Sequence, residues 1–367
     1  MRAERPAPLR AIAFSGIAGW ADDDLAPAFA AFRRSCARIV SVAGTPATGR
    51  GERGGDARRS RLLKKICQGA LALEGNLESG AARAFFESRF TPYIYSGNRL
   101  SGFVTGYLEP ELKGARKRSA RYSVPVYRTP KDLVQLFPDA ERARRNSEMT
   151  AGRKTDAGIA PYFDRREIEQ GALRGRGLEI LYLKNWADAF YMHIQGSGRV
   201  ALKEGGHVRL SYSAKNGHSY TAIGTALIER GAVSRDEMSM AAVRNWLDKN
   251  PRQARQLMWT NRSFIFFREA PPETASLGPV GAQGVVLTPR RSLAVDTSIH
   301  ALGTPVWVNA PELDLHGSKG FAQLMIAQDA GSAIQGAQRG DIFWGSGASA
   351  GAIAGAAKFR DEPTARL

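Results

Sequence analysis

The sequence predicts a mainly β protein with helices, made of two β-rich halves. Its 367 residues are enough for two domains with ample hydrophobic core. Hydrophobic residues make up 43% of the chain, which is an ordinary value for a globular protein. Short runs rich in β-branched and aromatic residues, each closed by Gly or Pro, recur through most of the chain. Such runs indicate strands that end in turns.

The first hundred residues carry helical patterns as well. After a short strand at 10–14, we expect helices over 22–38, 59–73 and 79–89, the last with Ser79 as a candidate N-cap. Three Asp residues at the start of the first helix suit the positive end of its dipole. The apolar residues of this helix share one face: Leu25, Phe29, Phe32 and Cys36.

The middle of the chain changes to short strands separated by many turns. Beyond a strand interrupted by Pro110, we interpret residues 113–273 as a β-rich module, with the small barrel as its expected form. This module also contains helical segments. One is predicted over 234–249 and opens with Ser234 and Glu237 as a capping box. The remainder of the chain returns to strand and turn patterns.

The charge balance favours a polyanionic partner. The formal net charge is +17, from 52 basic and 35 acidic side chains. The basic residues form scattered clusters, and no zinc-finger, RRM or KH signature is present, so we expect no nucleic-acid partner. A cell wall that carries peptide carboxylates, or an anionic membrane surface, fits the charge equally well. A solvated basic surface without a partner is the alternative.

The cysteines and histidines give no pattern typical of a metal site. Cys36 and Cys67 lie on predicted helices without a nearby histidine, and the five histidines include no pair at i and i+4. The two thiols can pair in an oxidising compartment or remain free and buried, and both interpretations stay open. The chain also lacks a P-loop and a dinucleotide fingerprint, so we expect no cofactor. No apolar run approaches the roughly 20 residues of a membrane helix.

Three aspartates in the last third of the chain are the candidate catalytic residues. Asp296, Asp329 and Asp341 each lie in a short, mostly apolar run closed by Gly or Pro. A carboxyl that is partly desolvated in such a setting has a raised pKa, which a general acid needs. For each aspartate alone, hydrogen bonding to turn amides is the competing interpretation. Their concentration in one region, with Phe343 and Trp344 beside the last, favours a site.

A second set of residues has the chemistry that sugar binding needs. Aromatic faces suit the apolar side of a sugar ring, and amides or hydroxyls suit its polar edge. Residues of this kind, with the glycine between two of them, lie in GYLEP, HIQGSGRV and SAKNGHSYTAIG: Tyr107, Gln195, Gly196, Ser197, Asn216 and Tyr220. Plain hairpins, with Gln and Asn as turn formers, are the alternative for these segments.

The ordered series of motifs resembles the family of membrane-bound lytic transglycosylase A (MltA), which has a C-terminal three-aspartate (3D) domain. GFVTGYLEPEL, PYFDRREIEQGAL, HIQGSGRV, SAKNGHSYTAIG, GPVGAQGVVLTP and GDIFWGSG carry the resemblance, which spans about Ile12 to Gly351. It implies a discontinuous double-psi β-barrel domain over 1–112 and 274–367. The family's second small β-barrel domain is then inserted as 113–273. The sugar-type residues, with Phe343 and Trp344, are expected to line a groove between the two domains.

The resemblance also implies the reaction, which is cleavage of peptidoglycan strands with a 1,6-anhydromuramyl product. A single aspartate is expected to act first as acid and then as base, and Asp341 matches the family's proposed catalytic acid. Asp329 matches a second family aspartate, expected to raise the pKa of Asp341 by like charge or to orient it by a hydrogen bond. Asp296 is expected to be structural or a subsite contact. Because positive charge would oppose a raised pKa, we expect the basic surplus to lie away from the site.

The two ends of the chain depart from the family pattern. After Gly351, the segment AIAGAAKFRDEPTARL shows no counterpart of the family's closing strand, so we expect an exposed barrel edge there. This departure keeps a second interpretation open, a catalytically inactive peptidoglycan-binding protein. The start, MRAERPAPLRAIAF, has neither a secretory signal nor a lipid-anchor cysteine, although the family is exported. We expect a monomer in the periplasm, associated with the outer membrane, whose export signal is not visible in this chain.

An aspartic protease is a weaker alternative. Asp296-Thr-Ser and Asp329-Ala-Gly resemble the turns in which two carboxylates share a proton in that class of enzyme. The spacing of 33 residues between the two aspartates is too short for the two lobes of a single-chain, pepsin-like enzyme.

Overall fold

The computed structural model describes most of the chain as two compact units. The described residues are 9–41, 54–95, 102–137, 149–271, 276–314, 319–347, 350–351, 358–360 and 365–366. Unit 1 is discontinuous and comprises Met1–Tyr107, Val280–Gly345 and Ala356–Leu367. Unit 2 comprises Leu108–Pro279 and Ser346–Gly355. The domain limits that the family resemblance implies, between residues 112 and 113 and between residues 273 and 274, remain a prediction.

The three predicted N-terminal helices are present in unit 1. They are α1 (Ala26–Ser41), α2 (Gly54–Ala72) and α3 (Ser79–Arg89). Helix α1 begins four residues later than predicted, so the preceding acidic residues lie before it rather than in its first turn. The carboxylate of Asp23 instead accepts two hydrogen bonds from the guanidinium of Arg291, at 2.8 and 2.7 Å, inside the unit.

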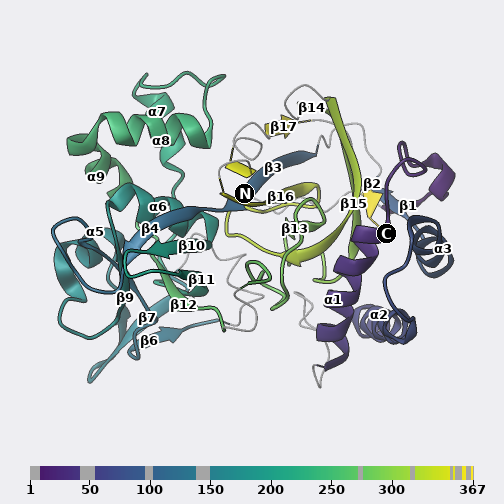
Figure 1. Ribbon diagram of the computed structural model, residues 1–367, viewed down its shortest axis with the longest axis horizontal. Coiled ribbons are helices and arrows are strands. Elements are labelled where there is room, and N and C mark those ends of the chain that lie inside the picture. Colours follow the sequence, from purple (N-terminus) through teal and green to yellow (C-terminus); the bar gives the residue numbers. More distant parts are fainter. Residues whose placement is uncertain are drawn as a thin grey trace. The chain divides into compact units, whose positions relative to one another are not determined.

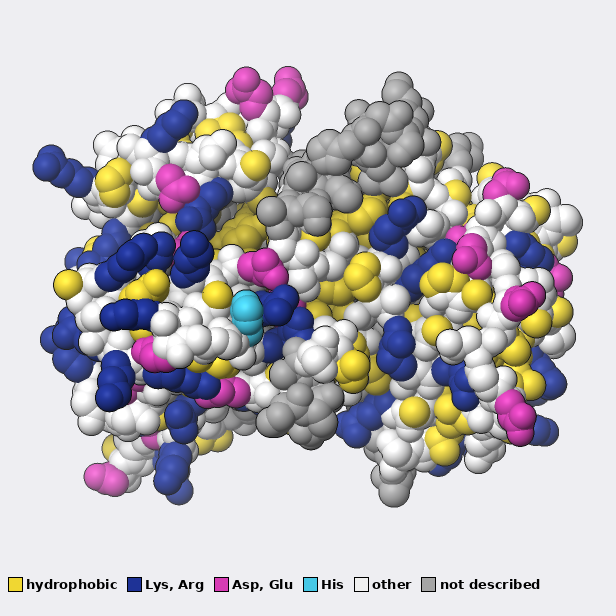
Figure 2. All heavy atoms as spheres, in the orientation of Figure 1, with side chains coloured by type: hydrophobic (Ala, Val, Ile, Leu, Met, Phe, Trp, Pro, Cys, Tyr) yellow, Lys and Arg dark blue, Asp and Glu magenta, His cyan; other side chains and the backbone are white. Residues whose placement is uncertain are grey.

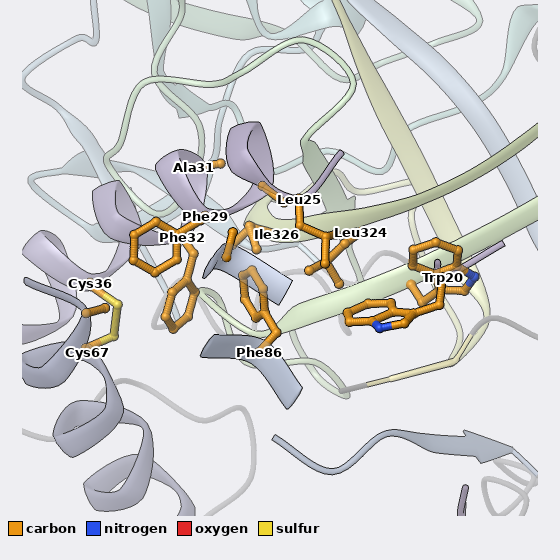
Figure 3. Packing of buried hydrophobic residues seen from close by; sticks show 14 of the residues in the cluster. Trp20, Leu25, Phe29, Ala31, Phe32, Cys36, Cys67, Phe86, Leu324 and Ile326 are labelled. Atoms are coloured by element: carbon orange, nitrogen blue, oxygen red, sulfur yellow. A yellow bond between two sulfur atoms is a disulfide. The ribbon is translucent and has the colours of Figure 1, made fainter. Parts of the chain in front are cut away.

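The apolar face of α1 packs against α3 and against the sheet of unit 1, and α1 lies along strand β15 (Lys319–Asp329). Figure 3 shows the aromatic and aliphatic side chains that meet there, among them Phe29, Phe32, Phe86, Leu324 and Ile326. Each fully buried side chain of this size stabilises the fold by roughly 1.5–3 kcal/mol. The hydrophobic effect therefore fixes these helices on the sheet.

Two details of the helices settle questions that the sequence left open or answered wrongly. Cys36 of α1 and Cys67 of α2 are buried and joined as a disulfide (Figure 3). Ser79 does not cap α3, because its hydroxyl accepts a hydrogen bond from the N–H of Leu25 at 3.0 Å. The predicted N-cap is therefore wrong, and the serine ties the start of α3 to the segment before α1.

In the residues that the structure describes, the rest of unit 1 is formed mainly by a nine-stranded sheet. Its strand order is β1-β2-β18-β14-β15-β13-β16-β3-β17. In addition to β15, the strands are β1 (Leu9–Ala11), β2 (Tyr93–Tyr95), β3 (Phe103–Glu109), β13 (Ser292–Val295), β14 (Pro305–Asp314), β16 (Arg339–Ser346), β17 (Lys358–Arg360) and β18 (Ala365–Arg366). A short 3₁₀ turn, Phe14–Gly16, follows β1.

The expectation that no strand follows Gly351 is wrong. Strand β17 pairs antiparallel with β3, and β18 pairs antiparallel with both β14 and β2. These strands have three and two residues. Strands so short cannot show the alternation of apolar and polar side chains by which a strand is found in a sequence.

Unit 2 contains a six-stranded sheet, a separate three-stranded sheet and a group of helices. The six-stranded order is β12-β11-β10-β4-β9-β5, and the three-stranded order is β6-β7-β8. The strands are β4 (Glu111–Ala115), β5 (Val124–Tyr127), β6 (Leu133–Gln135), β7 (Ala151–Thr155), β8 (Gly158–Pro161), β9 (Glu179–Leu183), β10 (Ser197–Leu202), β11 (His207–Lys215) and β12 (Ile265–Glu269). The helices are α5 (Arg165–Glu167), a π-helical turn (Ile168–Ala172), α6 (Trp186–Gln195), α7 (Ile223–Glu229), α8 (Met240–Lys249) and α9 (Pro251–Trp259).

The helix predicted over 234–249 begins later than expected. Helix α8 starts at Met240, and its N-cap is Ser239, whose hydroxyl accepts from the N–H of Ala242 at 3.0 Å. Ser234 and Glu237 do interact: the serine hydroxyl donates to the Glu237 carboxylate at 2.7 Å and accepts from the backbone N–H of Glu237 at 3.3 Å. The predicted capping box is therefore a separate turn before the helix.

The mainly β fold with helices is confirmed. In the residues that the structure describes, no helix has both the length and the apolar character needed to cross a membrane. Figure 2 shows Lys and Arg side chains distributed over the visible face of both units, with Asp and Glu side chains between them. The basic surplus is thus spread over the surface in this view.

Candidate active site

Strand β13 brings two of the three aspartates to one face of the unit 1 sheet. Ala294 of β13 pairs with Asp341 on β16 and with Asp329 on β15. Residues that pair across neighbouring strands point to the same face of a sheet. Neighbouring strands lie about 4.8 Å apart, so the backbones of the two aspartates are separated by about 10 Å, with only an alanine side chain between them.

A β-bulge decides on which face Asp329 lies. The register between β13 and β15 shifts by one residue, so that Gln328 and Asp329 together oppose Ala294. Regular alternation would turn Asp329 to the face opposite that of Asp341, because successive side chains of a strand point in opposite directions. The side chain of Gln328 is fully buried and bonds to Ser35 and Ser292, which holds the bulge in place.

Asp341 lies near the start of β16 and is partly exposed. Its Oδ1 accepts a hydrogen bond from the hydroxyl of Thr105 on β3, at 2.6 Å. Burial raises the pKa of Asp341 from its ordinary value of 3.8 to about 6. The charge of Arg339 and the bond from Thr105 oppose this rise, and the charge of Asp329 adds to it. Near neutral pH a useful fraction of this carboxyl therefore keeps its proton.

Asp329 is held by three hydrogen bonds, none of which comes from Asp341. Its Oδ1 accepts from the backbone N–H groups of Ala282 and Ala330, at 2.8 and 2.9 Å, and its Oδ2 accepts from the hydroxyl of Tyr107 at 2.7 Å. Burial raises the pKa of Asp329, and the three hydrogen bonds oppose the rise. Its influence on Asp341 thus acts through charge. The hydrogen bond that we considered between the two aspartates is not formed.

Asp296 serves a turn and is not part of this pair. It follows the end of β13, is buried, and accepts from the N–H groups of Ser298 and Gly336, at 2.9 and 2.8 Å. Both carboxylate oxygens are used by the backbone, so the residue fastens two loops of unit 1. This arrangement favours the structural role over a subsite contact.

The aromatic residues around the pair differ in their exposure. Tyr107 keeps some exposed surface, and its ring contacts that of Phe343 with centroids 5.3 Å apart. Phe343 and Trp344 are themselves buried, with 1% and 6% of their surface exposed. Trp344 packs edge-on against Phe321. These two residues therefore support the site from inside the unit, and we no longer count them among the sugar contacts.

Three predicted sugar-binding residues lie together in unit 2, where α6 ends and β10 begins. Gln195 is the last residue of α6, and its Oε1 accepts from the backbone N–H of Leu108 at 2.9 Å. Gly196 follows with φ of 74°, a left-handed conformation that glycine adopts without strain. Ser197 then begins β10 and is mostly buried. Gln195 is partly exposed.

Asn216 and Tyr220 lie further along unit 2 and have different environments. Asn216 is fully buried, donates to the backbone oxygens of Phe163 and Arg262, and accepts from the N–H of Phe264. Its amide is thus committed to the backbone, and we remove it from the proposed sugar contacts. Tyr220 remains partly exposed, and burial raises the pKa of its hydroxyl.

Two residues near Asp341 were not predicted from the sequence. Thr105 supplies its hydrogen bond, and Arg339, two residues before Asp341 on β16, donates to the hydroxyl of Thr105 at 2.7 Å. One positive charge, that of Arg339, therefore lies beside Asp341, although the basic surplus was expected to lie away from the site. Only the alternation of side chains along β16 could have indicated that Arg339 and Asp341 share a face.

The described residues contain no group of three or more His, Cys, Asp or Glu side chains arranged to hold a metal ion. The chemistry that the geometry offers is proton transfer by a carboxyl with a raised pKa, beside a second carboxyl and a phenol. Because Asp329 is engaged by three donors, Asp341 is the group that is free to exchange a proton.

Comparisons with known proteins agree with this fold. Residues 103–268 match the "MltA specific insert domain", and residues 291–361 match the "3D domain". A crystal structure of a membrane-bound lytic murein transglycosylase from Agrobacterium tumefaciens is 36% identical in sequence. It superposes with a TM-score of 0.86 over 98% of this chain and 97% of that one. The structure of Escherichia coli MltA with bound chitohexaose has a TM-score of 0.66 at 26% identity, over 99% of this chain and 94% of that one.

The Escherichia coli (strain K12) protein "membrane-bound lytic murein transglycosylase A" is 35% identical over 257 residues. That match covers 68% of this chain and 61% of the relative's length. The fold of both units, the order of the two matched regions and the near-complete overlap with the Agrobacterium structure lead to one assignment. The chain belongs to the family of membrane-bound lytic transglycosylase A, with its 3D domain.

Proposed function

We propose that this protein is a peptidoglycan lytic transglycosylase, a carbon–oxygen lyase that acts on the glycan strands of the cell wall. The substrate bond is the β-1,4 bond between N-acetylmuramic acid and N-acetylglucosamine. The observation that carries the proposal is the partly buried carboxyl of Asp341, whose pKa is raised by burial to about 6. Its family membership and the chitohexaose bound by Escherichia coli MltA support the class of substrate.

In the proposed reaction, Asp341 gives its proton to the glycosidic oxygen, and the bond between that oxygen and the anomeric carbon breaks. The 6-hydroxyl of the muramyl sugar attacks the anomeric carbon, and its proton passes to the ionised Asp341. A 1,6-anhydro ring closes, no water is consumed, and the carboxyl ends protonated as it began. The sugar's own hydroxyl is held next to the reacting carbon, which gives it a high effective concentration.

The remaining roles follow from the contacts described above. Asp329 keeps a negative charge on the same face as Asp341 and so helps to hold the catalytic proton. Tyr107 in unit 1, and Gln195, Gly196, Ser197 and Tyr220 in unit 2, are the proposed contacts to the glycan. That these segments line one groove between the family's two domains is part of the proposal.

The place of action is also proposed. We propose that the protein acts in the periplasm, at the outer membrane, and its membrane-bound relatives support a place in the cell envelope. We propose that it acts as a monomer without a cofactor, and that its basic surface favours the anionic wall or membrane.

The test is incubation with purified peptidoglycan, followed by mass analysis of the soluble products. Anhydromuropeptides would establish the transglycosylase reaction, whereas products with a reducing end would show a hydrolase. Binding to the wall without release of any product would favour the second candidate, an inactive peptidoglycan-binding protein. Asp341→Asn is the matched control, because it keeps the shape of the side chain and cannot transfer a proton.

A further inference from the structure

Arg339, Thr105 and Asp341 form a continuous chain of hydrogen bonds on one face of the unit 1 sheet. Arg339 and Asp341 are two residues apart on β16, so their side chains share a face. The guanidinium donates to the hydroxyl oxygen of Thr105 at 2.7 Å, and that hydroxyl donates to Oδ1 of Asp341 at 2.6 Å.

Arg339 has several partners that fix its position. Its guanidinium carbon lies 4.8 Å from the centre of the Phe103 ring, and the group also donates to the backbone oxygens of Phe103 and Gly340. Burial lowers the pKa of Arg339, and the charge of Asp341 opposes that change. An arginine stays protonated in proteins even so. The donor at the start of the chain is therefore permanent.

The direction of this chain follows from the chemistry of its members. A guanidinium only donates hydrogen bonds, so the oxygen of Thr105 must accept from Arg339. The hydroxyl has one hydrogen, and it points to Oδ1 of Asp341. A proton on Oδ1 would meet that hydrogen, so Oδ1 is kept as an acceptor. Oδ2 has no hydrogen-bond partner within the part of the chain that the structure describes, and it is the oxygen left to carry a proton.

Apart from Thr105, the groups that face Asp341 form no hydrogen bond with its carboxyl in the residues that the structure describes. From β3 come Thr105 and Tyr107, and the Tyr107 hydroxyl is given to Asp329. From β13 comes Ala294, which does not titrate, and from β15 comes Asp329, whose charge acts at a distance. Arg339 is thus the one described cation whose charge affects Asp341.

We propose that Arg339 is a positioning residue for the reaction, which acts through Thr105 to assign the exchangeable proton of Asp341 to Oδ2. The inference rests on the proposed function and names the oxygen atom of Asp341 that carries the proton. The bond between Oδ2 and hydrogen breaks when the glycosidic oxygen is protonated, and it forms again with the proton of the 6-hydroxyl. Between these steps, the negative carboxylate is stabilised by the Thr105 hydrogen bond and the nearby positive charge.

The experiment compares Arg339→Met and Thr105→Val with the conservative variants Arg339→Lys and Thr105→Ser. Arg290→Met is the matched control, because Arg290 also stacks on a phenylalanine of unit 1, at 6.0 Å, but makes no contact with Asp341. The first readout is the pH dependence of kcat/KM on purified glycan strands. The second is infrared titration of the Asp341 carboxyl, isolated as the difference between spectra with and without Asp341→Asn in the same background.

Arg339→Met removes a positive charge, and Thr105→Val removes a donor to the ionised form. Each change therefore raises the pKa of Asp341. We expect the alkaline limb of the profile to move to higher pH by about one pH unit. We also expect the plateau rate to fall at least tenfold, because the carboxyl loses its fixed orientation. Arg339→Lys keeps the positive charge, Thr105→Ser keeps the hydroxyl, and Arg290→Met leaves Arg339 and Thr105 in place. In these three variants the Asp341 carboxyl should therefore titrate as it does in the wild type.

An unmoved titration in both Arg339→Met and Thr105→Val would overturn the inference, even if both lose activity. A loss in rate at all pH values without a shift would show a structural role only. If Arg339→Met does not fold, Thr105→Val decides alone, since Val has nearly the shape of Thr. The infrared readout needs no substrate. A wild type that releases no anhydromuropeptides would therefore count against the proposed function and leave the coupling of Arg339 and Thr105 to Asp341 still measurable.

Discussion

Asp341→Asn should remove the proposed activity and at the same time make the protein more stable at neutral pH. In the folded protein, burial raises the pKa of Asp341 from 3.8 to about 6, so folding favours the protonated form. Above the folded pKa, the native state must hold an ionised carboxyl in a poorly solvated place. Asparagine has almost the same shape and does not ionise, so the variant escapes this penalty.

The magnitude follows from the pKa change. One pKa unit corresponds to about 1.36 kcal/mol, so a rise from 3.8 to about 6 corresponds to about 3 kcal/mol. The side chain keeps some exposure, so solvent screens part of this, and we expect a gain of about 1–3 kcal/mol. Between the two pKa values the native state binds more protons than the unfolded state does. The wild type therefore loses stability as pH rises through this window, and the variant does not.

The assay is urea unfolding of both proteins at pH 4 and at pH 7.5, with peptidoglycan release measured in parallel. The stability gain should be present at pH 7.5 and nearly absent at pH 4, where the wild-type carboxyl is protonated in the folded state. Release of anhydromuropeptides should fall toward the upper end of the roughly hundred- to ten-thousand-fold loss typical of a missing acid, because one group makes both proton transfers.

A contrasting control sharpens this test. Asp296→Asn should lose stability at neutral pH by about 1–3 kcal/mol, because both oxygens of Asp296 accept backbone hydrogen bonds and an amide can satisfy only one of them. Equal stability gains for Asp341→Asn at both pH values would refute the role of burial in raising its pKa. Activity that survives in Asp341→Asn but is lost in Asp329→Asn would show that the wrong carboxylate had been chosen.

The other predictions concern charge, a buried ion pair, the disulfide and salt. Asp329→Asn should move the alkaline limb of the pH profile to lower pH, because the charge of Asp329 raises the pKa of Asp341; an unchanged limb would exclude this coupling. Asp23→Ala should cost about 3–5 kcal/mol in urea unfolding, since it leaves a buried arginine unpaired, and a cost below 1 kcal/mol would contradict that reason. Reduction of the disulfide, which joins cysteines at a sequence separation of 31, should lower stability by about 3–4 kcal/mol; two free thiols in protein from the cell envelope would show that the pair does not form there. Binding to peptidoglycan should weaken as salt rises, and a pull-down that does not change up to roughly physiological salt would count against the basic surface.

The sequence predicted those parts of the molecule that repeat a simple pattern or belong to a long ordered series of motifs. The mainly β fold, the three N-terminal helices and the apolar setting of Asp341 were all predicted in this way. The short strands β17 and β18 were not, since two or three residues show no period. The start of α1 was displaced where Asp23 has a tertiary partner in Arg291, and the predicted N-cap of α3 was wrong because Ser79 accepts from the N–H of Leu25.

The candidate site was only partly predictable for a related reason. A residue's chemistry can be read from its type, but its neighbours depend on strand register. Thr105 and Arg339 became part of the site because β3 lies beside β16, more than 200 residues away in the chain. Asn216 has a side chain suited to sugars, yet the fold buries it and uses its amide for backbone contacts. Phe343 and Trp344 are suited as well, and they pack inward.

The bulge at Gln328 makes the chemistry of the site depend on a count of residues. Inserting one residue between Gln328 and Asp329 would move Asp329 one place along β15 and turn its carboxyl away from Asp341, with every existing side chain kept. A length change is therefore a more severe test of this strand than most substitutions. It also suggests a way to separate the two acidic groups without altering either of them, which is to change the spacing of the strand that carries one.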